Sequence, residues 1–347
     1  MNRLPGEFEE QRAVVMLFPS RNDVWRKNCK PIRESMVALA NTLSEYVPVV
    51  MGVLPELMEI AQNEYSLKAG VKLVPMKYND CWARDSVSSV LIGDKPYISA
   101  FGFNAYGGEL YAEWDDDARL DCTIAKEFGY PIKQNSLTLE GGNILPDGNG
   151  TVFAVKDSIL NENRNPGLSQ EDVEQLLAEA TASCQIIWLE RGLEGDETGG
   201  HIDNIMAFCD PHTVLLSYTD DRSNAHYEIT HEIDAFLRTV RNADGEPYKI
   251  IHVPIPDLYR RTHEDSDTVV NGIGSFPREA GDAVLETYVN FALTNDVVVV
   301  PQYGCDLDQK ALDIIGAAFP TRKIVPLYGR EATLGGGGFH CLTKHIN

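Results

Sequence analysis

Thr151-Val-Phe-Ala-Val155 begins the stretch 151–203, whose pattern predicts the fold of the whole chain. The expected strand is followed by a helix that starts at Ser169 and carries apolar residues at helical spacing, at Val173, Leu176, Leu177 and Ala180. A second apolar strand, Gln185-Ile-Ile-Trp-Leu189, comes next. The stretch closes with Gly199-Gly-His-Ile-Asp203, which we expect to be a strand with functional side chains. The unit is therefore a strand, a helix, a second strand and a closing strand that carries the candidate functional side chains.

This unit recurs along the chain, and five copies can be found. Their first strands are expected at 13–18, 97–101, 151–155, 213–217 and 297–300. The helices that follow are expected near 31–43, 117–128, 169–180, 227–240 and 307–319. The first copy also contains an extra helix near 54–65 and a strand at 71–76. The closing strand of the fourth copy, around Asp267 to Ile273, is the least clear of the set.

The repeat predicts how the elements are assembled. Each copy must bury its helix and strands against its neighbours, so we expect one closed, roughly radial α/β domain over residues 1–347. A doubly wound sheet is the alternative, because it shows the same alternation of strands and helices. The nucleotide-binding patterns GxGxxG and GxxxxGK[ST] do not occur, so the sequence gives no support for a nucleotide site.

Composition excludes several classes of function. The formal net charge of −22 argues against binding to nucleic acid or to an anionic membrane, and it would attract a small cation. No apolar run reaches the about 18 residues of a membrane span, and the first residues lack the pattern of a secretory signal. The seven cysteines form no CxxC pair, which argues against a disulfide framework or a zinc knuckle. We expect a cytoplasmic protein.

Chemistry-bearing residues stand at the closing position of four of the five copies. They are Asp85, Glu140, His201 with Asp203, and Cys341, the last within the glycine-rich run 335–341. In a radial arrangement, equivalent positions lie near the axis. We therefore expect these side chains to surround one site.

A Cys beside a His can perform covalent catalysis, because the thiolate is the nucleophile and an imidazole can move its proton. The same pair would suit a papain-like protease, but several carboxylates would repel the oxyanion of a peptide substrate and would bind a cation. A guanidinium matches carboxylates through its planar fork of N–H donors, and Trp82 could stack on it. A metal site formed by Glu197, His201, Asp203 and His340 stays open as an alternative.

Longer motifs resemble the agmatine deiminases of the guanidine-modifying (pentein) superfamily, relatives of the bacterial-type peptidyl-arginine deiminases. The motifs are Leu4-Pro-Gly-Glu-Phe-Glu9, Trp82-Ala-Arg-Asp85, Phe103-Asn-Ala-Tyr-Gly-Gly108, Leu139-Glu-Gly-Gly-Asn143, Gly195-Asp-Glu-Thr-Gly-Gly-His-Ile-Asp203, Tyr288-Val-Asn-Phe291, Val300-Pro-Gln-Tyr-Gly304 and Gly336-Gly-Gly-Phe-His-Cys341. The resemblance implies a five-bladed pseudo-symmetric α/β propeller of ββαβ modules, without a metal or organic cofactor.

The resemblance also implies roles for the candidate residues. Cys341 would attack the guanidinium carbon, while Asp85 and Asp203 would orient the guanidinium nitrogens. Glu140 and His201 would complete the cage, with His201 protonating the departing ammonia and then activating water. Glu197 matches an acid that lies near the substrate in this family, and Trp82 would contact the substrate.

The chain departs from the family pattern at a few positions. Ser86-Val-Ser-Ser89 replaces a Gly-Pro segment, Gly338 replaces an Asn, Lys344 replaces a Gln, and the stretch 107–114 is altered. We expect all of these near the mouth of the site.

The function expected from the residues and the resemblance is deimination of agmatine to N-carbamoylputrescine and ammonia by a homo-oligomer, either a dimer or a tetramer. The alternatives are a deiminase of free or peptidyl arginine, with Arg222 or Arg261 binding a carboxylate, a metal-dependent hydrolase, and a non-catalytic guanidine-binding module.

Overall fold

Five small sheets with one common strand order make up most of the β-structure in the computed structural model, which describes residues 2–270, 272 and 274–347. In each sheet an inner strand lies antiparallel to the middle strand, and an outer strand lies parallel to it. The predicted mixed α/β fold is therefore confirmed. The alternative of one doubly wound sheet is wrong, because the described strands divide among separate sheets.

The sheets are numbered by the chain order of their middle strands. The first contains β18 (Lys344–Ile346), β1 (Ala13–Leu17), β2 (Val49–Val53) and β3 (Val71–Pro75). The second contains β4 (Ser89–Leu91), β5 (Tyr97–Gly102) and β6 (Ile132–Thr138). The third contains β7 (Ile144–Pro146), β8 (Thr151–Val155) and β9 (Gln185–Leu189). The fourth contains β10 (Met206–Asp210), β11 (Thr213–Tyr218) and β12 (Lys249–Pro254). The fifth contains β15 (Ala292–Leu293), β16 (Val297–Gln302) and β17 (Lys323–Tyr328).

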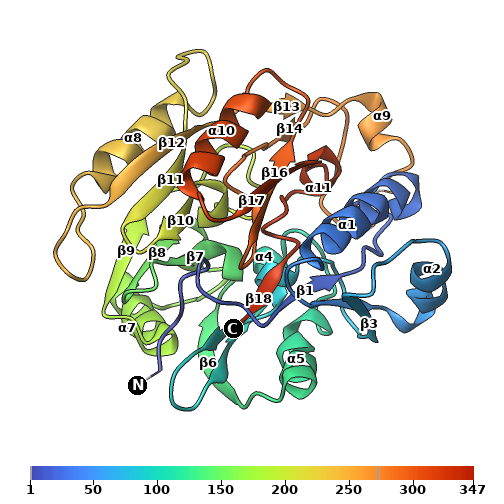
Figure 1. The fold of residues 1–347 in the computed structure, drawn as a ribbon, viewed down its shortest axis with the longest axis horizontal. Coiled ribbons are helices and arrows are strands. Elements are labelled where there is room, and N and C mark those ends of the chain that lie inside the picture. Colours follow the sequence, from blue (N-terminus) through green and yellow to red (C-terminus); the bar gives the residue numbers. More distant parts are fainter. Residues whose placement is uncertain (1, 271, 273) are drawn as a thin grey trace.

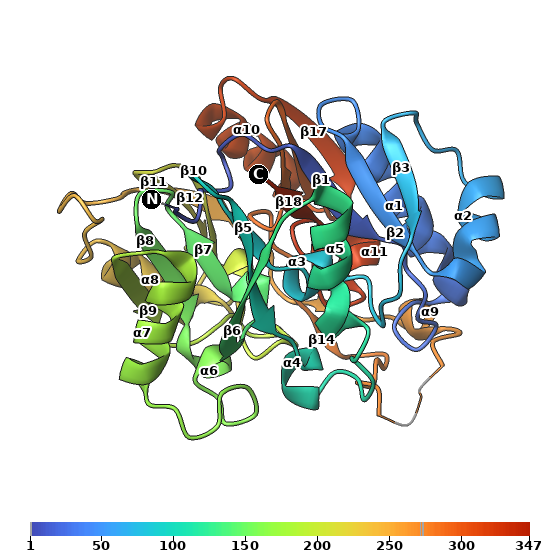
Figure 2. The ribbon, with the colours of Figure 1, turned by 90° about the horizontal axis from the view of Figure 1, so that it is seen from below.

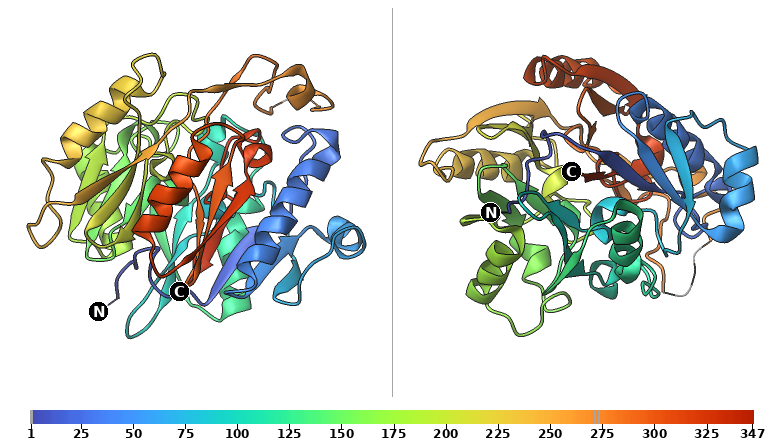
Figure 3. Two further views of the ribbon diagram at one scale, coloured as in Figure 1. Left: turned by 45° about the horizontal axis from the view of Figure 1, so that its top comes forward. Right: turned by 60° about the horizontal axis from the view of Figure 1, so that its bottom comes forward.

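One helix connects the middle strand to the outer parallel strand in each sheet, as a parallel pair requires. These helices are α1 (Lys30–Leu43), α5 (Leu120–Phe128), α7 (Gln170–Thr181), α8 (Tyr227–Leu237) and α10 (Asp308–Ala318). The predicted start of the third helix is confirmed, since the Ser169 hydroxyl accepts a hydrogen bond from the backbone N–H of Asp172. The right view of Figure 3 shows these helices on the outside and the strands toward the middle. In Figure 2, α7 and α8 lie at one side of the molecule, and α1 lies at the other.

The middle strands are the most apolar elements, because they are covered on both faces. All residues of β1 and β8 are buried, and β16 is buried except at Gln302. The outer strands β3 and β17 are only partly buried. The core therefore follows the middle strands and the inner faces of the connecting helices.

Smaller elements complete the fold. They are α2 (Met58–Asn63), α3 (Ala83–Ser86), α4 (Ala105–Gly108), α6 (Lys156–Ile159), α9 (His263–Ser266), α11 (Arg330–Thr333) and the ribbon of β13 (Tyr259–Arg260) with β14 (Ala283–Val284). Among the residues that the structure describes, no helix is long and apolar enough to cross a membrane.

The predicted closing strand of the fourth copy, at 267–273, needs a correction. Residues 271 and 273 lie outside the described residues, and the described ones around them form no strand. The element that takes the inner position beside β16 is instead β15, where Ala292 pairs with Val299 and Leu293 with Val298. The long connection between β12 and β15 hid this strand in the sequence.

The first and last strands of the chain lie side by side in the first sheet, as Figure 1 shows. The C-terminal strand β18 pairs antiparallel with β1, with Val15 opposite Lys344 and Ala13 opposite Ile346. This pairing fixes the position of Cys341, which lies three residues before β18.

Candidate active site

Short turns just before the inner strands carry the candidate residues. Asp85 lies in α3, Glu140 precedes a turn of 3₁₀-helix at Gly141–Asn143, and Asp203 lies in another such turn at Ile202–Asn204. These segments were predicted as strands, and that prediction is wrong for the functional residues themselves. A turn directs successive side chains toward the same side, whereas a strand alternates them between its two faces.

Asp85 is buried and is held by two donors. Its Oδ2 accepts a hydrogen bond from the Tyr106 hydroxyl at 2.8 Å, and its Oδ1 accepts one from the backbone N–H of Gly142, also at 2.8 Å. A Cβ at position 142 would lie 2.7 Å from Nδ1 of His201 and 2.8 Å from Oδ1 of Asp85, so only glycine fits. Burial raises the pKa of Asp85, while the charge of His201 opposes this effect.

Glu140 has one oxygen in use and one without a partner. Arg164 donates from Nε to Oε1 at 3.1 Å, and its Nη2 donates to the backbone carbonyl of Thr198 at 2.6 Å. Oε2 is buried without a hydrogen-bond partner. Burial alone would raise the pKa of Glu140, but the nearby His201 and Arg164 bring it below the ordinary value. Glu140 is therefore an ionised carboxylate whose Oε2 accepts no hydrogen bond and lies 3.9 Å from Nε2 of His201.

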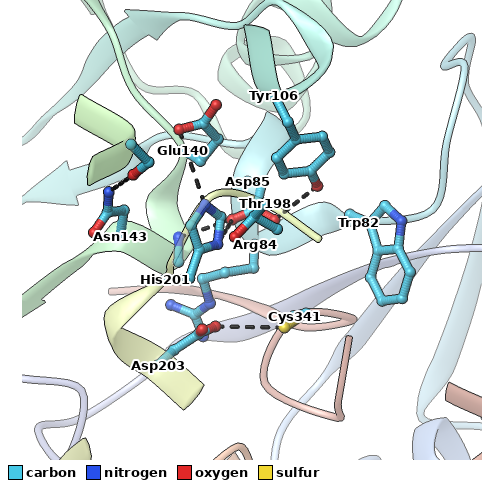
Figure 4. A network of polar contacts seen from close by, with 12 residues as sticks. Trp82, Arg84, Asp85, Tyr106, Glu140, Asn143, Thr198, His201, Asp203 and Cys341 are labelled. Carbon is cyan, nitrogen blue, oxygen red and sulfur yellow. Dashed lines mark hydrogen bonds and ion pairs between the residues drawn. The ribbon is translucent and has the colours of Figure 1, made fainter. Parts of the chain in front are cut away.

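His201 is buried between two of the carboxylates (Figure 4). Its Nδ1 lies 3.8 Å from Oδ1 of Asp85, and its Nε2 lies 3.9 Å from Oε2 of Glu140. Burial alone would lower the pKa of this imidazole, but Asp85 and Glu140 outweigh it and raise the pKa to about 9. The backbone N–H of His201 donates to Oδ2 of Asp196 at 2.9 Å, which fixes the turn. The imidazole is thus cationic at neutral pH.

Asp203 lies beside the thiol. Its Oδ2 is 2.8 Å from Nδ1 of His340 and 3.4 Å from Sγ of Cys341, whereas its Oδ1 is buried without a partner. Burial would raise its pKa, but the hydrogen bond from His340 and the charge of that ring lower it. Asp203 therefore resembles Glu140, because each carboxylate has one oxygen held and one vacant.

Cys341 is buried at the base of the pocket. Burial, Asp203 and Asp85 together raise the pKa of its thiol well above the ordinary value, so the sulfur carries its proton in this state. Asn290 contacts the sulfur through its amide nitrogen at 3.2 Å. A cation placed among the carboxylates would reverse the electrostatic effect and favour the thiolate.

Asn290 is the residue that the sequence analysis missed. It lies two residues before β15 in the fourth unit, much as Asp85, Glu140, Asp203 and Cys341 lie three or four residues before β4, β7, β10 and β18. Its Oδ1 also accepts a hydrogen bond from the backbone N–H of His340 at 3.1 Å. The motif Tyr288-Val-Asn-Phe291 was the available signal, but the strand expected at 267–273 placed the end of the fourth copy elsewhere.

Trp82 and Glu197 form part of the outer wall. The Trp82 ring packs against Trp25, with centroids 5.6 Å apart, and a Cβ on Gly337 would lie 2.7 Å from its edge. Glu197 pairs with Arg278, whose Nη2 lies 2.5 Å from Oε2. Burial raises the pKa of Glu197, and Arg278 only partly offsets this.

A narrow pocket connects the outer wall to the candidate catalytic residues. Asp85, His201, Cys341, Trp82 and Glu197 line it, together with Tyr106, Leu110, Thr198, Asn204 and Gly335–Gly337. Glu140 and Asp203 lie directly behind this lining, against His201 and Cys341. Of the described residues in the pocket wall, none is Lys or Arg, so the wall favours a cationic ligand.

The alternative metal set is not assembled. Glu197 is engaged by Arg278, while His340 lies on the other side of Asp203 and contacts Glu7. No cluster of three or more His, Cys, Asp or Glu with the geometry of metal ligands occurs in the described part of the chain.

The family departures do not all lie at the mouth, which corrects that expectation. Lys344 is buried, and its Nζ donates to the hydroxyl of Ser89 at 2.8 Å, so two of the departures contact each other. Gly338 lies against Asn290, where an added Cβ would approach Oδ1 to 2.4 Å. Only the altered stretch 107–114 reaches the pocket wall, through Leu110.

Comparisons with known proteins give the family. Residues 3–346 match the model of the Porphyromonas-type peptidyl-arginine deiminase family. "Putative agmatine deiminase 2" of Listeria monocytogenes is 36% identical, with 99% of this chain and 94% of the relative covered. "Putative agmatine deiminase" of Shewanella sp. (strain MR-4) is 37% identical, with 99% and 93% covered.

Solved structures agree with this assignment. The agmatine deiminase of Enterococcus faecalis superposes with a TM-score of 0.95 at 33% identity, covering 99% of this chain and 95% of that one. DDAH from Pseudomonas aeruginosa, at 12% identity and a TM-score of 0.50 over 97% of this chain and all of that one, shares the fold alone. The chain belongs to the Porphyromonas-type peptidyl-arginine deiminase family.

Proposed function

We propose that this protein is an agmatine deiminase that hydrolyses agmatine to N-carbamoylputrescine and ammonia through a covalent intermediate on Cys341. The observation that carries the proposal is the pocket itself. Its wall holds a buried Cys, a cationic His and carboxylates, without Lys or Arg among its described residues. Relatives that cover nearly the whole chain bear the name agmatine deiminase.

The guanidinium would bind where the carboxylates have vacant oxygens. Oδ1 of Asp203 and Oε2 of Glu140 are buried acceptors without partners, and Asp85 lies across His201 from Glu140. Charge-assisted hydrogen bonds from guanidinium N–H groups would satisfy these oxygens and orient the guanidinium plane. Its positive charge would then lower the pKa of Cys341, so that the thiol loses its proton to solvent and becomes the nucleophile.

The reaction follows from the positions of Cys341 and His201. The thiolate attacks the guanidinium carbon and forms a C–S bond. The imidazolium of His201 gives its proton to one nitrogen, the C–N bond breaks, and ammonia leaves, which produces an S-alkylthiouronium. The neutral His201 then takes a proton from water while the water oxygen attacks the same carbon. The C–S bond breaks, the remaining hydroxyl proton passes to the sulfur, and the thiol and the urea product are released.

The tail of the substrate would lie against the outer wall. Trp82 would cover the aliphatic stem, and Glu197 would face the terminal ammonium. An α-carboxylate would need a cation at this place. Arg222 is exposed and lies over Tyr227, outside the pocket, while Arg261 is buried and donates to the carbonyl of Leu334. Neither is in the wall, which supports agmatine over free arginine.

The proposal extends to the assembly of the chain. The five sheets of common strand order, closed by the pairing of β18 with β1, support a five-bladed α/β propeller that forms a single domain over residues 1–347. All seven cysteines are unpaired, which supports a reducing, cytoplasmic location. We propose a homo-oligomer, a dimer or a tetramer, which light scattering of the purified protein would test.

A panel assay tests the activity. Ammonia release is measured from agmatine, free arginine and an arginyl peptide, with and without a chelator, and Cys341→Ala is the control variant. We expect turnover of agmatine that resists the chelator and disappears in the variant. Turnover of arginine with agmatine inert would contradict the substrate, and equal release by Cys341→Ala would contradict the mechanism. Loss on chelation would favour a metal hydrolase, and no turnover at all would favour a binding module.

A further inference from the structure

Glu7 extends from the N-terminal segment to a position below the pocket. Its side chain is only 13% exposed, although it belongs to the loop before β1. Its Oε1 lies 2.6 Å from Nη1 of Arg84 and 3.3 Å from Nε2 of His345, and its Oε2 lies 2.6 Å from Nε2 of His340. The catalytic steps proposed above give this buried carboxylate no task.

His340 connects Glu7 to the site. Its Nε2 faces the carboxylate of Glu7, and its Nδ1 faces Oδ2 of Asp203 at 2.8 Å. An ionised carboxylate can only accept hydrogen bonds, so an imidazole between two of them must donate from both nitrogens. Such a ring is doubly protonated and carries a positive charge.

The charges around this ring are consistent with that protonation state. The pKa of Glu7 lies well below its ordinary value, because the charges of Arg84 and His340 outweigh the effect of burial. The pKa of His340 is raised, since Glu7 and Asp203 outweigh burial and the charge of Arg84. His345 has a pKa lowered to about 4 by burial and Arg84, so it is neutral and adds no competing charge. Lys344, the other basic group near Glu7 and Arg84, has a pKa lowered to about 7 by burial.

We propose that Glu7 and His340 are positioning residues of this site, in which Glu7 keeps His340 as an imidazolium and His340 holds Oδ2 of Asp203 so that Oδ1 faces the guanidinium. This inference rests on the proposed deiminase function. Positive and negative groups then alternate from Arg84 through Glu7 and His340 to Asp203. The guanidinium of the substrate would be the next positive group.

Glu140 supports this assignment, because a cation also holds one of its oxygens while the other accepts no hydrogen bond. Arg164 donates to Oε1 of Glu140 and leaves Oε2 without a hydrogen bond, facing His201, and His340 likewise contacts Oδ2 of Asp203 and leaves Oδ1 without one. A cation behind each carboxylate fixes its orientation and keeps it ionised before the substrate arrives. The two supports differ in one respect: Arg164 is a permanent cation, whereas the charge of His340 depends on Glu7.

The first test compares Glu7→Gln with a matched control, Glu9→Gln. Glu9 lies in the same N-terminal segment but pairs with Arg3 near the surface, at 2.5 Å. The activity that depends on protonated His340 is lost as the pH rises through its pKa, and removal of the Glu7 charge lowers that pKa. We therefore expect the pKa of His340 itself, read from its ring resonances in an NMR titration, to move down by about one unit in Glu7→Gln and to stay in place in Glu9→Gln.

The second test compares two variants of His340. In His340→Asn the amide nitrogen takes the place of Nδ1 and can still donate to Asp203, whereas in His340→Gln it takes the place of Nε2 and faces Glu7. We expect kcat/KM for agmatine to fall about 10-fold in the first and about 100-fold in the second, mainly through KM. The double variant Glu7→Gln with His340→Asn should be no worse than His340→Asn alone, because the two residues act in series.

Each outcome has a separate meaning. If the wild-type enzyme is active but the pKa of His340 does not shift in Glu7→Gln, or the two His340 variants lose equal activity, the positioning role is overturned and the proposed function stands. A wild-type enzyme that releases no ammonia from agmatine would instead contradict the proposed function. Thermal unfolding of every variant identifies loss of fold, and if Glu7→Gln does not fold, the comparison of the two His340 variants decides.

Discussion

Carboxylates lie in both halves of the pocket, the inner half around Cys341 and the outer half around Glu197, but their partners differ. In the inner half, Glu140 and Asp203 each have one oxygen held by a cation and one without a partner. In the outer half, Glu197 is paired with Arg278, which is itself held by the carbonyl of Gly335 at 2.7 Å. Under the proposed function, the inner half would bind the guanidinium and perform the chemistry, and the outer half would select the tail of the substrate.

The largest effect is expected from a change in the inner half. Glu140→Gln removes a charge from the guanidinium cage and one of the groups that raises the pKa of His201. Fewer enzyme molecules then carry the imidazolium that protonates ammonia. We expect kcat/KM for agmatine to fall about 10³-fold, with a clear loss in kcat, as measured by ammonia release. A change confined to KM would show that the inner half only binds substrate.

A smaller effect is expected in the outer half. Glu197→Gln should raise KM for agmatine about 10-fold and leave kcat nearly unchanged, because the residue lies away from the reacting carbon. A guanidine without a terminal amine, such as butylguanidine, serves as the control substrate. Its KM should be the same in the variant and the wild type. Equal losses for both substrates would remove the distinction between the two halves.

The smallest effect is expected from a substitution of Lys344, which lies below the inner half of the pocket. Burial lowers its pKa to about 7, so the folded protein binds fewer protons at this group than the unfolded chain between about pH 7 and 10.5. Burying the charged ammonium of Lys344 therefore lowers the folding stability by its full amount at low pH. This loss disappears as the pH rises through the pKa of the lysine in the unfolded chain. We expect Lys344→Gln to raise Tm by a few degrees at pH 7 and by less at pH 10, as measured by calorimetry. A gain that grows with pH would contradict this assignment.

The sequence predicted the repeating architecture well because each copy carries its own signals. The apolar middle strands and the five amphipathic helices have the expected periodicity, and Ser169 caps its helix as predicted. The fourth copy failed, since its inner strand β15 has only two residues and follows a long connection. A strand of this length has no measurable alternation, so the error also hid Asn290.

Some residues of the site could not be predicted, because their contacts join parts of the chain that are distant in sequence. Asp85, Glu140, His201, Asp203 and Cys341 could be found because each stands in a short distinctive motif at an equivalent position. The support behind them could not, because Glu7 meets His340 only through folding, at a separation of 333 residues. The burial of Lys344 was likewise hidden, since a lysine near a chain end is usually exposed.

The most direct test of the central claim, that Cys341 attacks a guanidinium held by the inner half, is mass spectrometry of acid-quenched enzyme during turnover of agmatine. We predict an added mass equal to agmatine less ammonia on the peptide that contains Cys341, and no such addition in Cys341→Ala. Ammonia release while that peptide keeps its unmodified mass at every quench time would contradict the claim.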